Sequence, residues 1–209
     1  MKIEACVFDF GGVMTTSIMP ERVRPLVASL GLEWKIIDEG FAKYRRLMDG
    51  DFITIDEMYS KIWQDAGIDV PAEVTAKIVE EDQASFLYPN LETLAFMRSL
   101  KERGFAIGIL TNMCSSFATL FRKHFADFIS LSDATVISGE VHLYKPMREI
   151  YDLLRGKLGT EAGRICFFDD VEANCQGARD AGWQAIRFSD AKQAEADLLK
   201  LTGEPGAGA

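Results

Sequence analysis

Residues 3–12 read IEACVFDFGG, in which an apolar run ends in a carboxylate and two glycines. A short apolar run without alternation is typical of a strand in a parallel sheet, because helices cover both faces of such a sheet. The run places Asp9 at the end of the strand, beside the crevice where open α/β sheets bind ligands. A simple turn would also use Asp and Gly. The tetrad Asp9-Phe10-Gly11-Gly12 gains weight from a second apolar run that ends in carboxylates, Phe167-Phe168-Asp169-Asp170.

The chain from residue 88 to residue 201 alternates between helical and strand-like segments. Apolar runs between the helical stripes predict strands at 105–110, 128–131, 165–168 and 185–188. Residues 136–143 could form a small hairpin. A βαβ series of this kind predicts a parallel sheet with helices on both faces, so the expected fold class is α/β.

Residues 15–87 have helical patterning and look like an insert between the first strand and the rest of the sheet. Thr54 and Glu57 have the spacing of a capping box, and the apolar residues after them recur at helical intervals. We therefore expect a catalytic core formed by residues 1–14 and 88–201 and a helical cap at 15–87. A flexible tail is expected at 202–209, which is rich in Gly, Pro and Ala.

The composition predicts a packed globular protein and argues against charged polymers as partners. Of the 209 residues, 48% are apolar and 26% are charged, as in ordinary globular proteins. A net charge of −9 argues against a nucleic acid or an anionic membrane as the main partner. The chain has no apolar run of membrane-spanning length and starts in a strand without a basic leader, so a cytoplasmic location is expected. The four cysteines form no CxxC pair, and buried thiols are expected rather than disulfides or a zinc site.

The strands of a parallel sheet end at the same edge, so the residues that follow them should lie together. Asp9 follows the first strand, Thr111-Asn112 follow the strand at 105–110, and Asp169-Asp170 follow the strand at 165–168. Lys145-Pro146 opens a helix between the last two strands. Carboxylates, a hydroxyl, an amide and a lysine suit a magnesium and phosphoryl site, because Mg²⁺ prefers oxygen ligands and phosphoryl groups need N–H and O–H donors.

Each of these groups also has an ordinary structural explanation. Thr111-Asn112 could cap the next helix, Lys145 could be a solvated lysine, and Asp169-Asp170 could favour a helix dipole. All three explanations would have to coincide with the Asp9 motif in one chain. The functional explanation is therefore favoured for Asp9, Lys145 and Asp170.

Taken together, the four segments resemble the four motifs of the haloacid dehalogenase superfamily of hydrolases. The matching stretches are Phe8-Asp9-Phe10-Gly11-Gly12-Val13, Leu110-Thr111-Asn112, Tyr144-Lys145-Pro146, and Phe167-Phe168-Asp169-Asp170 with Asn174. The resemblance implies a Rossmann-like three-layer core and a small helical cap domain that selects substrates. Within the superfamily, the sequence is most similar to sugar-phosphate phosphatases and to the amino-terminal phosphatase domain of soluble epoxide hydrolases. The implied activity is that of a Mg²⁺-dependent phosphatase of a small phosphorylated metabolite.

The resemblance also implies a role for each motif residue. Asp9 would be the nucleophile that attacks phosphorus and forms an aspartyl-phosphate. The implied ligands of Mg²⁺ are Asp9, the backbone carbonyl of Gly11, Asp170 and, by binding or by orienting the others, Asp169. The groups implied to bind the phosphoryl oxygens are Thr111, Lys145 and the amides near Phe10 and Asn112.

Gly11 departs from the pattern of phosphatases in this superfamily, which usually carry an aspartate at that position. The aspartate protonates the leaving oxygen and later activates water, and such a group contributes roughly 10² to 10⁴-fold to the rate. A leaving group that needs little protonation, as in an anomeric sugar phosphate or an acyl phosphate, would compensate. So would an acid from the cap, for which the sequence offers Glu39, Tyr44 and Asp49.

Two other functions remain open. Dehalogenases of the superfamily also lack the second aspartate, but they lose the acidic pair that is intact here at Asp169-Asp170. Retaining two neighbouring carboxylates makes most sense with a cation between them and Asp9, so a phosphatase ranks above a dehalogenase. The third possibility is a phosphometabolite-binding protein without catalysis. The substrate and the oligomeric state are not specified by the sequence.

Overall fold

A five-stranded parallel sheet forms the centre of the computed structural model, which describes residues 2–16 and 19–203. In chain order, its strands are β1 (Ala5–Phe8), β2 (Ala106–Thr111), β3 (Ala134–Ile137), β4 (Ile165–Asp169) and β5 (Gln184–Arg187). Their order in the sheet is β3-β2-β1-β4-β5, and all four pairs are parallel. The predicted α/β class is therefore confirmed.

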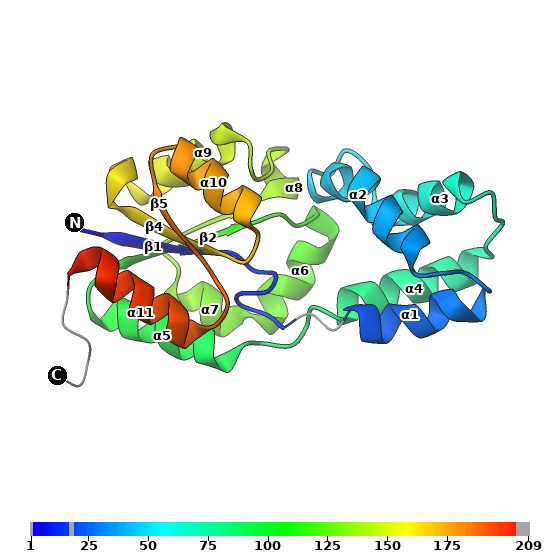
Figure 1. Ribbon diagram of the computed structural model, residues 1–209, viewed down its shortest axis with the longest axis horizontal. Helices are drawn as coiled ribbons and strands as arrows, with labels where there is room; N and C mark the ends of the chain where they lie inside the picture. The colour runs from blue at the N-terminus through cyan, green and yellow to red at the C-terminus, as the bar shows by residue number, and fades with distance from the viewer. Residues whose placement is uncertain (1, 17–18, 204–209) are drawn as a thin grey trace.

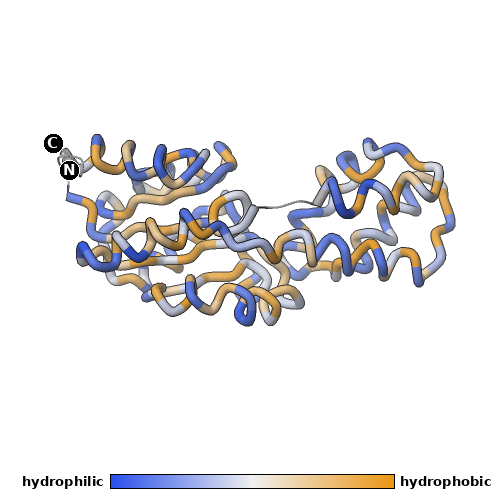
Figure 2. The backbone as a smooth tube through the Cα atoms, turned by 90° about the horizontal axis from the view of Figure 1, so that it is seen from below, coloured by the Kyte–Doolittle hydropathy of each residue, from blue (hydrophilic) through white to orange (hydrophobic). Residues whose placement is uncertain are grey.

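Helices cover both faces of the sheet (Figure 1). Those from the second part of the chain are α5 (Leu91–Glu102), α6 (Ser115–His124), α7 (Ala126–Leu131), α8 (Ser138–Val141), α9 (Arg148–Leu158), the 3₁₀ turn η1 (Ala162–Arg164), α10 (Glu172–Asp180) and α11 (Ala191–Thr202). The pair α9 and α10 packs on one face, and the pair α5 and α11 packs on the other. The strands β1, β2 and β4 between them are largely apolar, and Figure 2 shows hydrophobic stretches of chain running through this part of the molecule.

Strand alternation sends neighbouring side chains of β1 into two different cores. Ala5 and Val7 join the cluster beneath α9 and α10, whereas Cys6 and Phe8 join the cluster beneath α5. All four residues of β1 are buried because both faces are covered. The same burial applies to all four cysteines, as predicted.

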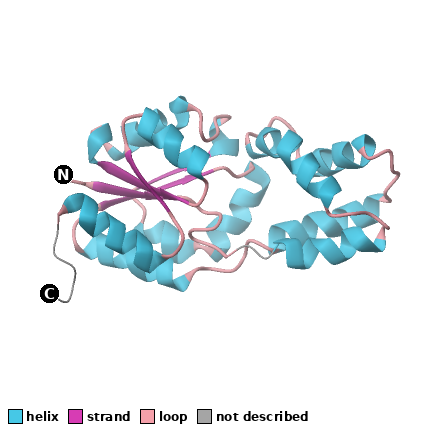
Figure 3. Ribbon diagram, in the orientation of Figure 1, coloured by secondary structure: helices cyan, strands magenta, loops and turns pink. Residues whose placement is uncertain are grey.

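The described part of the chain between β1 and α5 contains four helices, and the five strands of the sheet lie outside it (Figure 3). They are α1 (Met19–Ser29), α2 (Lys35–Asp49), α3 (Ile55–Asp65) and α4 (Ala72–Ala84). The predicted capping box starts α3, since Thr54 accepts from the Glu57 amide and Glu57 accepts from the Thr54 amide. Fully buried Tyr59 on α3 packs against Trp63 and Phe41. The division into a core and a cap remains a prediction, although the helical character of the segment matches it.

Thr15 joins the two stretches of chain that connect the four-helix segment with the sheet. Its hydroxyl lies 2.7 Å from the carbonyl of Phe86 and 2.9 Å from that of Tyr88. Asn90 donates its backbone N–H to the carbonyl of Met14 at 2.9 Å, and Thr93 donates its hydroxyl to that of Val13 at 2.8 Å. The outgoing and returning chains are thus bonded side by side.

Two predicted elements are wrong. Residues 128–131, predicted as a strand, belong to α7, because Phe128 packs on Phe125 at the end of the preceding helix. Residues 136–143, predicted as a hairpin, contain the end of β3 and the short helix α8. No hairpin forms in this described stretch, because the chain turns into α8 directly after β3 and does not return as a second strand.

The carboxyl-terminal helix α11 extends to Thr202, at the start of the predicted flexible tail, and residues 204–209 of that tail lie outside the described residues. Among the residues that the structure describes, none of the helices combines the length and apolar character needed to cross a membrane.

Candidate active site

The ends of β1 and β4 bring three of the predicted carboxylates together. Phe8 is in register with Phe168, and Asp9 donates its backbone N–H to the Phe168 carbonyl at 2.9 Å. Asp9, Asp169 and Asp170 each offer a carboxylate oxygen, and these oxygens lie within 4.8 Å of one another. Two apolar strand ends far apart in sequence therefore form one acidic cluster.

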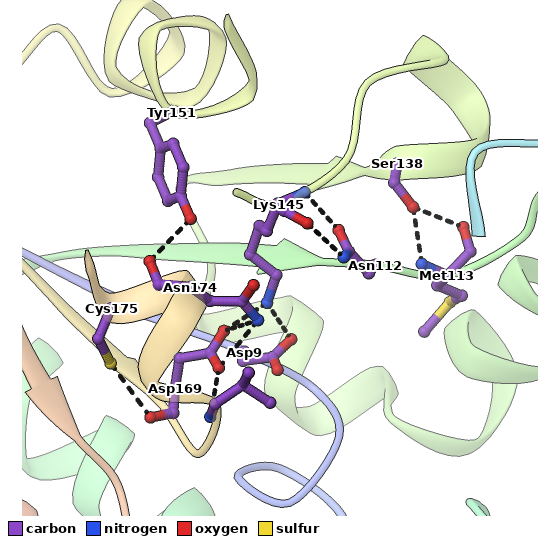
Figure 4. A network of polar contacts seen from close by, with 10 residues as sticks. Asp9, Asn112, Met113, Ser138, Lys145, Tyr151, Asp169, Asn174 and Cys175 are labelled. Carbon is purple, nitrogen blue, oxygen red and sulfur yellow. Dashed lines mark hydrogen bonds and ion pairs between the residues drawn. The ribbon is translucent and has the colours of Figure 1, made fainter. Parts of the chain in front are cut away.

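Lys145 supplies the cation that faces this cluster. Its side chain is 1% exposed, and its Nζ lies 2.7 Å from Asp9 Oδ1 and 2.6 Å from Asp169 Oδ2. Asn112 fixes the lysine backbone by accepting from its N–H at 2.7 Å and donating to its carbonyl at 3.1 Å. Figure 4 shows this pairing beside the carboxylates. The amide after β2 thus positions the lysine.

Asp169 is fully buried and surrounded by donors. Its Oδ1 accepts from the Val171 amide at 2.8 Å and from Asn174 Nδ2 at 3.1 Å. Its Oδ2 accepts from Asn174 Nδ2 at 3.1 Å and from Lys145 Nζ at 2.6 Å. Asp169 therefore orients the lysine and the loop before α10 (Figure 4).

Asp170 packs against Gly12, the second glycine after Asp9. A Cβ on Gly12 would lie 2.5 Å from Asp170 Oδ2, and the backbone of Gly12 has a φ of +70°, so both the space and the conformation favour glycine. Three carboxylates and one lysine leave the cluster with excess negative charge. A divalent cation would neutralise it, and the oxygen donors are those that Mg²⁺ prefers, so the residues fit this ion.

Burial and mutual repulsion govern the ionisation of the cluster. Burial and the charge of Asp169 raise the pKa of Asp9, and Lys145 opposes this rise. Burial alone would lower the pKa of Lys145, but Asp9 and Asp169 raise it above its usual value, so the lysine stays charged. Burial and Asp169 also raise the pKa of Asp170. A cation among the carboxylates would favour their ionised forms.

A pocket of about 520 Å³ opens over the cluster. The predicted site residues that line it are Asp9, Phe10, Gly11, Asn112, Lys145 and Asp170. A Cβ on Gly11 would meet nothing within 4 Å, so the space above this residue is open. Thr111 is buried at the end of β2 and is absent from the lining among the described residues. Its binding role, like the other roles assigned from the sequence, remains a prediction.

The four-helix segment supplies the opposite wall of the pocket. Its lining residues are Arg45, Met48, Asp49, Ile55, Asp82, Gln83 and Phe86. Arg45 Nε lies 3.3 Å from Asp49 Oδ1, and its Nη1 lies 3.9 Å from Asp82 Oδ2. Sequence reasoning missed Arg45 and Asp82, because single charged residues on helices are usually solvated and no pattern distinguishes these two.

The turn between α2 and α3 is bonded to the sheet end of the pocket. Ser138 donates to the carbonyl of Asp49 at 2.5 Å and accepts from the Met113 amide at 2.7 Å. The Asp51 carboxylate accepts from the amide and the hydroxyl of Ser115. Ser138, which the sequence predicts within a hairpin, therefore holds the helical wall next to the end of β2.

The family model of the haloacid dehalogenase-like hydrolases matches residues 3–182. This match covers the four-helix segment and every strand of the sheet except β5. It also includes every residue of the acidic cluster and Lys145. The chain therefore belongs to the haloacid dehalogenase-like hydrolase family.

Individual relatives agree with this assignment. The chain is 28% identical to bifunctional epoxide hydrolase 2 of the pig, Sus scrofa, over 225 aligned residues that cover 97% of this chain and 39% of that protein. It spans about two fifths of the length of that relative. It is 23% identical to phosphatase MT3486 of Mycobacterium tuberculosis, with 99% of this chain and 97% of that protein covered.

A solved structure shares the fold. The HAD family enzyme BT-2542 of Bacteroides thetaiotaomicron, in complex with magnesium and inorganic phosphate, superposes with a TM-score of 0.65 at 20% identity. The superposition covers 88% of this chain and 93% of that enzyme. At this identity the likeness concerns the fold alone.

Proposed function

We propose that the protein is a Mg²⁺-dependent phosphatase that hydrolyses a small phosphorylated metabolite through an aspartyl-phosphate. The observation that carries the proposal is the acidic cluster of Asp9, Asp169 and Asp170, within 4.8 Å, with Lys145 Nζ bonded to two of its members. The cluster faces a pocket large enough for a small organic phosphate. Two relatives support a phosphatase activity by analogy: BT-2542 forms a complex with magnesium and inorganic phosphate, and MT3486 is a phosphatase.

The oxygens proposed to hold Mg²⁺ belong to Asp9, the Gly11 carbonyl and Asp170. Asp169 has its oxygens engaged by Lys145, Val171 and Asn174, which favours an orienting role over direct binding. When bound, the ion would neutralise phosphoryl charge and draw the substrate towards the carboxylates.

The remaining steps fall to the protein's own side chains. Asp9 attacks phosphorus and displaces the ester oxygen, and water then hydrolyses the resulting acyl phosphate to inorganic phosphate, so that one difficult displacement is split into two easier ones. Lys145 favours the ionised form of Asp9 against the effect of burial and stabilises charge on the transferred oxygens. Asn112 holds the lysine in place. Thr111 remains the proposed hydroxyl donor to the phosphoryl group.

A panel of sugar phosphates and acyl phosphates tests the proposal. Phosphate release should require Mg²⁺ and should be lost in the Asp9→Asn variant, whose amide fills the same space but is not a nucleophile. Asp133→Asn is a matched control, because it makes the same change in a carboxylate that binds Lys101 and the Ile107 amide far from the pocket.

Two outcomes would replace the proposal. Gly11, in the position of the usual second aspartate, is the feature that favours a dehalogenase, and release of halide from a 2-haloacid without metal would establish that activity. Stabilisation of the protein by phosphate esters without turnover would indicate a binding protein. The cytoplasmic location expected from the sequence remains a prediction.

A further inference from the structure

The proposed reaction lacks a proton donor at position 11, where phosphatases of this superfamily usually carry an aspartate. An ester oxygen leaves phosphorus as a strongly basic alkoxide or phenoxide unless it is protonated, so the rate depends on a nearby acid. Gly11 has no side chain, and the pocket above it is open. The acid must then come from another lining residue. This inference rests on the proposed phosphatase activity.

Few residues around the pocket can give up a proton. Lys145 is held by two carboxylates that raise its pKa, and Arg45 stays protonated as guanidinium groups do. Asp82 is 1% exposed and accepts a hydrogen bond from Tyr59, which holds it inside the helical segment. Asp49 lines the same pocket as Asp82, but it is 7% exposed and its carboxylate pairs with Arg45 on its own helix rather than with a tyrosine inside the helical segment.

The other two acids considered from the sequence lie elsewhere. Glu39 is exposed and pairs with Lys35 on the surface of α2. The hydroxyl of Tyr44 donates to Asp65 at 2.7 Å, on α3. Neither residue is among the described residues that line the pocket. The structure therefore separates Asp49 from its two alternatives.

The backbone of Asp49 is fixed against the catalytic end of the sheet. Ser138 connects its carbonyl to the amide of Met113, which directly follows Asn112. Asp51, two residues further on, is bonded to Ser115 at the start of α6. A Cβ on Gly139 would lie 2.8 Å from Asp51 Oδ1, so a glycine allows this close approach. The last turn of α2 is thus held over the same edge that presents Asp9.

We propose that Asp49 is the general acid and base that replaces the residue missing at Gly11. As the Asp9 oxygen bonds to phosphorus and the ester P–O bond breaks, the Asp49 carboxyl gives its proton to the leaving oxygen, and the alcohol departs. The Asp49 carboxylate then takes a proton from a water molecule that attacks the aspartyl-phosphate. Phosphate leaves, Asp9 regains its carboxylate, and Asp49 is again protonated.

The environment of Asp49 suits a group that must carry a proton. Burial raises its pKa, and the charge of Asp82 on α4 acts in the same direction. Arg45, one turn earlier on α2, and Lys145, on the core side, oppose this rise. A carboxyl whose pKa is raised in this way holds its proton to a higher pH than an ordinary aspartate, as a general acid requires.

Two esters of similar shape test the proposal: phenyl phosphate, whose leaving group needs a proton, and p-nitrophenyl phosphate, whose leaving group is a stable anion. Asp49→Asn should lower kcat/KM for phenyl phosphate by roughly 10²-fold or more, and that for p-nitrophenyl phosphate by less than roughly tenfold. Equal losses for both esters, or no loss for either, would overturn the proposal, because a structural or binding role does not depend on the leaving group.

Two further variants sharpen the result. Asp51→Asn changes a carboxylate in the same turn. If this variant lowers kcat/KM, it should do so by the same factor for both esters. Gly11→Asp in the Asp49→Asn background should restore phenyl phosphate hydrolysis, since the space above Gly11 is open and its backbone is not left-handed. A double variant as slow as Asp49→Asn would count against proton donation.

The wild-type protein gives a test that does not depend on any variant folding. With an acid in place, it should hydrolyse the two esters at similar rates. A steep preference for p-nitrophenyl phosphate would show that no acid acts and would overturn the role of Asp49 while leaving the proposed function intact. Hydrolysis of neither ester nor of any sugar or acyl phosphate would overturn the proposed function itself, and the role of Asp49 with it.

Discussion

Replacing Lys145 by methionine tests how strongly the acidic cluster depends on its cation. The lysine is 1% exposed and its Nζ lies within 2.7 Å of both Asp9 and Asp169. Methionine has a similar length and fills the same space, so the variant removes the charge and its hydrogen bonds without leaving a large cavity. The negative charges of Asp9, Asp169 and Asp170 then lie close together without the positive charge of the lysine.

The expected cost follows from the burial of these groups. Removing one partner of a buried ion pair costs about 3 to 5 kcal/mol, because the other charge remains buried and unpaired. A typical domain has a free energy of unfolding of about 5 to 15 kcal/mol, so this loss is a large part of the total. The loss should be greatest at neutral pH. Lys145 opposes the rise in the pKa of Asp9, so without it Asp9 is more easily protonated as the pH falls, and the gap from the wild type narrows in acid.

Urea unfolding of metal-free protein at pH 7, followed by tryptophan fluorescence, measures the loss. Lys101→Met is the matched control: Lys101 makes an exposed pair with Asp133, and its removal should cost no more than about 1 kcal/mol. Adding Asp9→Asn to Lys145→Met should recover part of the stability, since it removes one of the unpaired charges. A Lys145→Met variant within about 1 kcal/mol of the wild type would refute the reasoning and show that water compensates the cluster.

Three further predictions concern stability away from the cluster. Asp133→Asn should cost about 1 kcal/mol at neutral pH, an amount discounted for solvent screening. Although partial burial acts to raise the pKa of Asp133, its lysine partner and a backbone amide lower it, so its stabilising effect is lost as the pH falls through its folded pKa and the two urea midpoints should converge in acid. Tyr59→Phe removes the donor to buried Asp82 and should lower the free energy of unfolding by about 1 to 3 kcal/mol; an unchanged urea midpoint would contradict this. Gly139→Ala places a Cβ 2.6 Å from a backbone nitrogen and should cost about 1 to 3 kcal/mol by thermal unfolding, whereas Gly163→Ala, with nothing within 4 Å, should stay within about 0.5 kcal/mol.

The sheet could be predicted where its strands are buried on both faces. The sequences of β1, β2 and β4 are continuous apolar runs, and the residues at their ends meet as the parallel arrangement requires. The strand β3 was mistaken because its first two residues are only partly buried and the apolar run before it, at 128–131, is helical. A short apolar run does not distinguish a strand from a helix by period alone.

The wall of the pocket that comes from the four-helix segment could not be predicted. Asp82 lies in the polar run Glu80-Glu81-Asp82-Gln83, which reads as a solvated face, yet it is buried beside Tyr59. Asp49 was one of three acids that the sequence could not separate, and only the turn held by Ser138 places it in the pocket. Such contacts depend on how the helices pack against the sheet, and local sequence patterns do not predict this packing.

The hydroxyl of Thr15, which binds the returning chain at Phe86 and Tyr88, bears on how the pocket can open. Two independent linkers would let the four helices twist as well as tilt. Linkers bonded side by side at one point resist twisting and leave a tilt about a single axis as the easy motion. We expect any opening to lift Asp49 away from Asp9 along one path and to return it to the same place, so that substrate entry and exit need not disturb the registration of the two carboxyl groups.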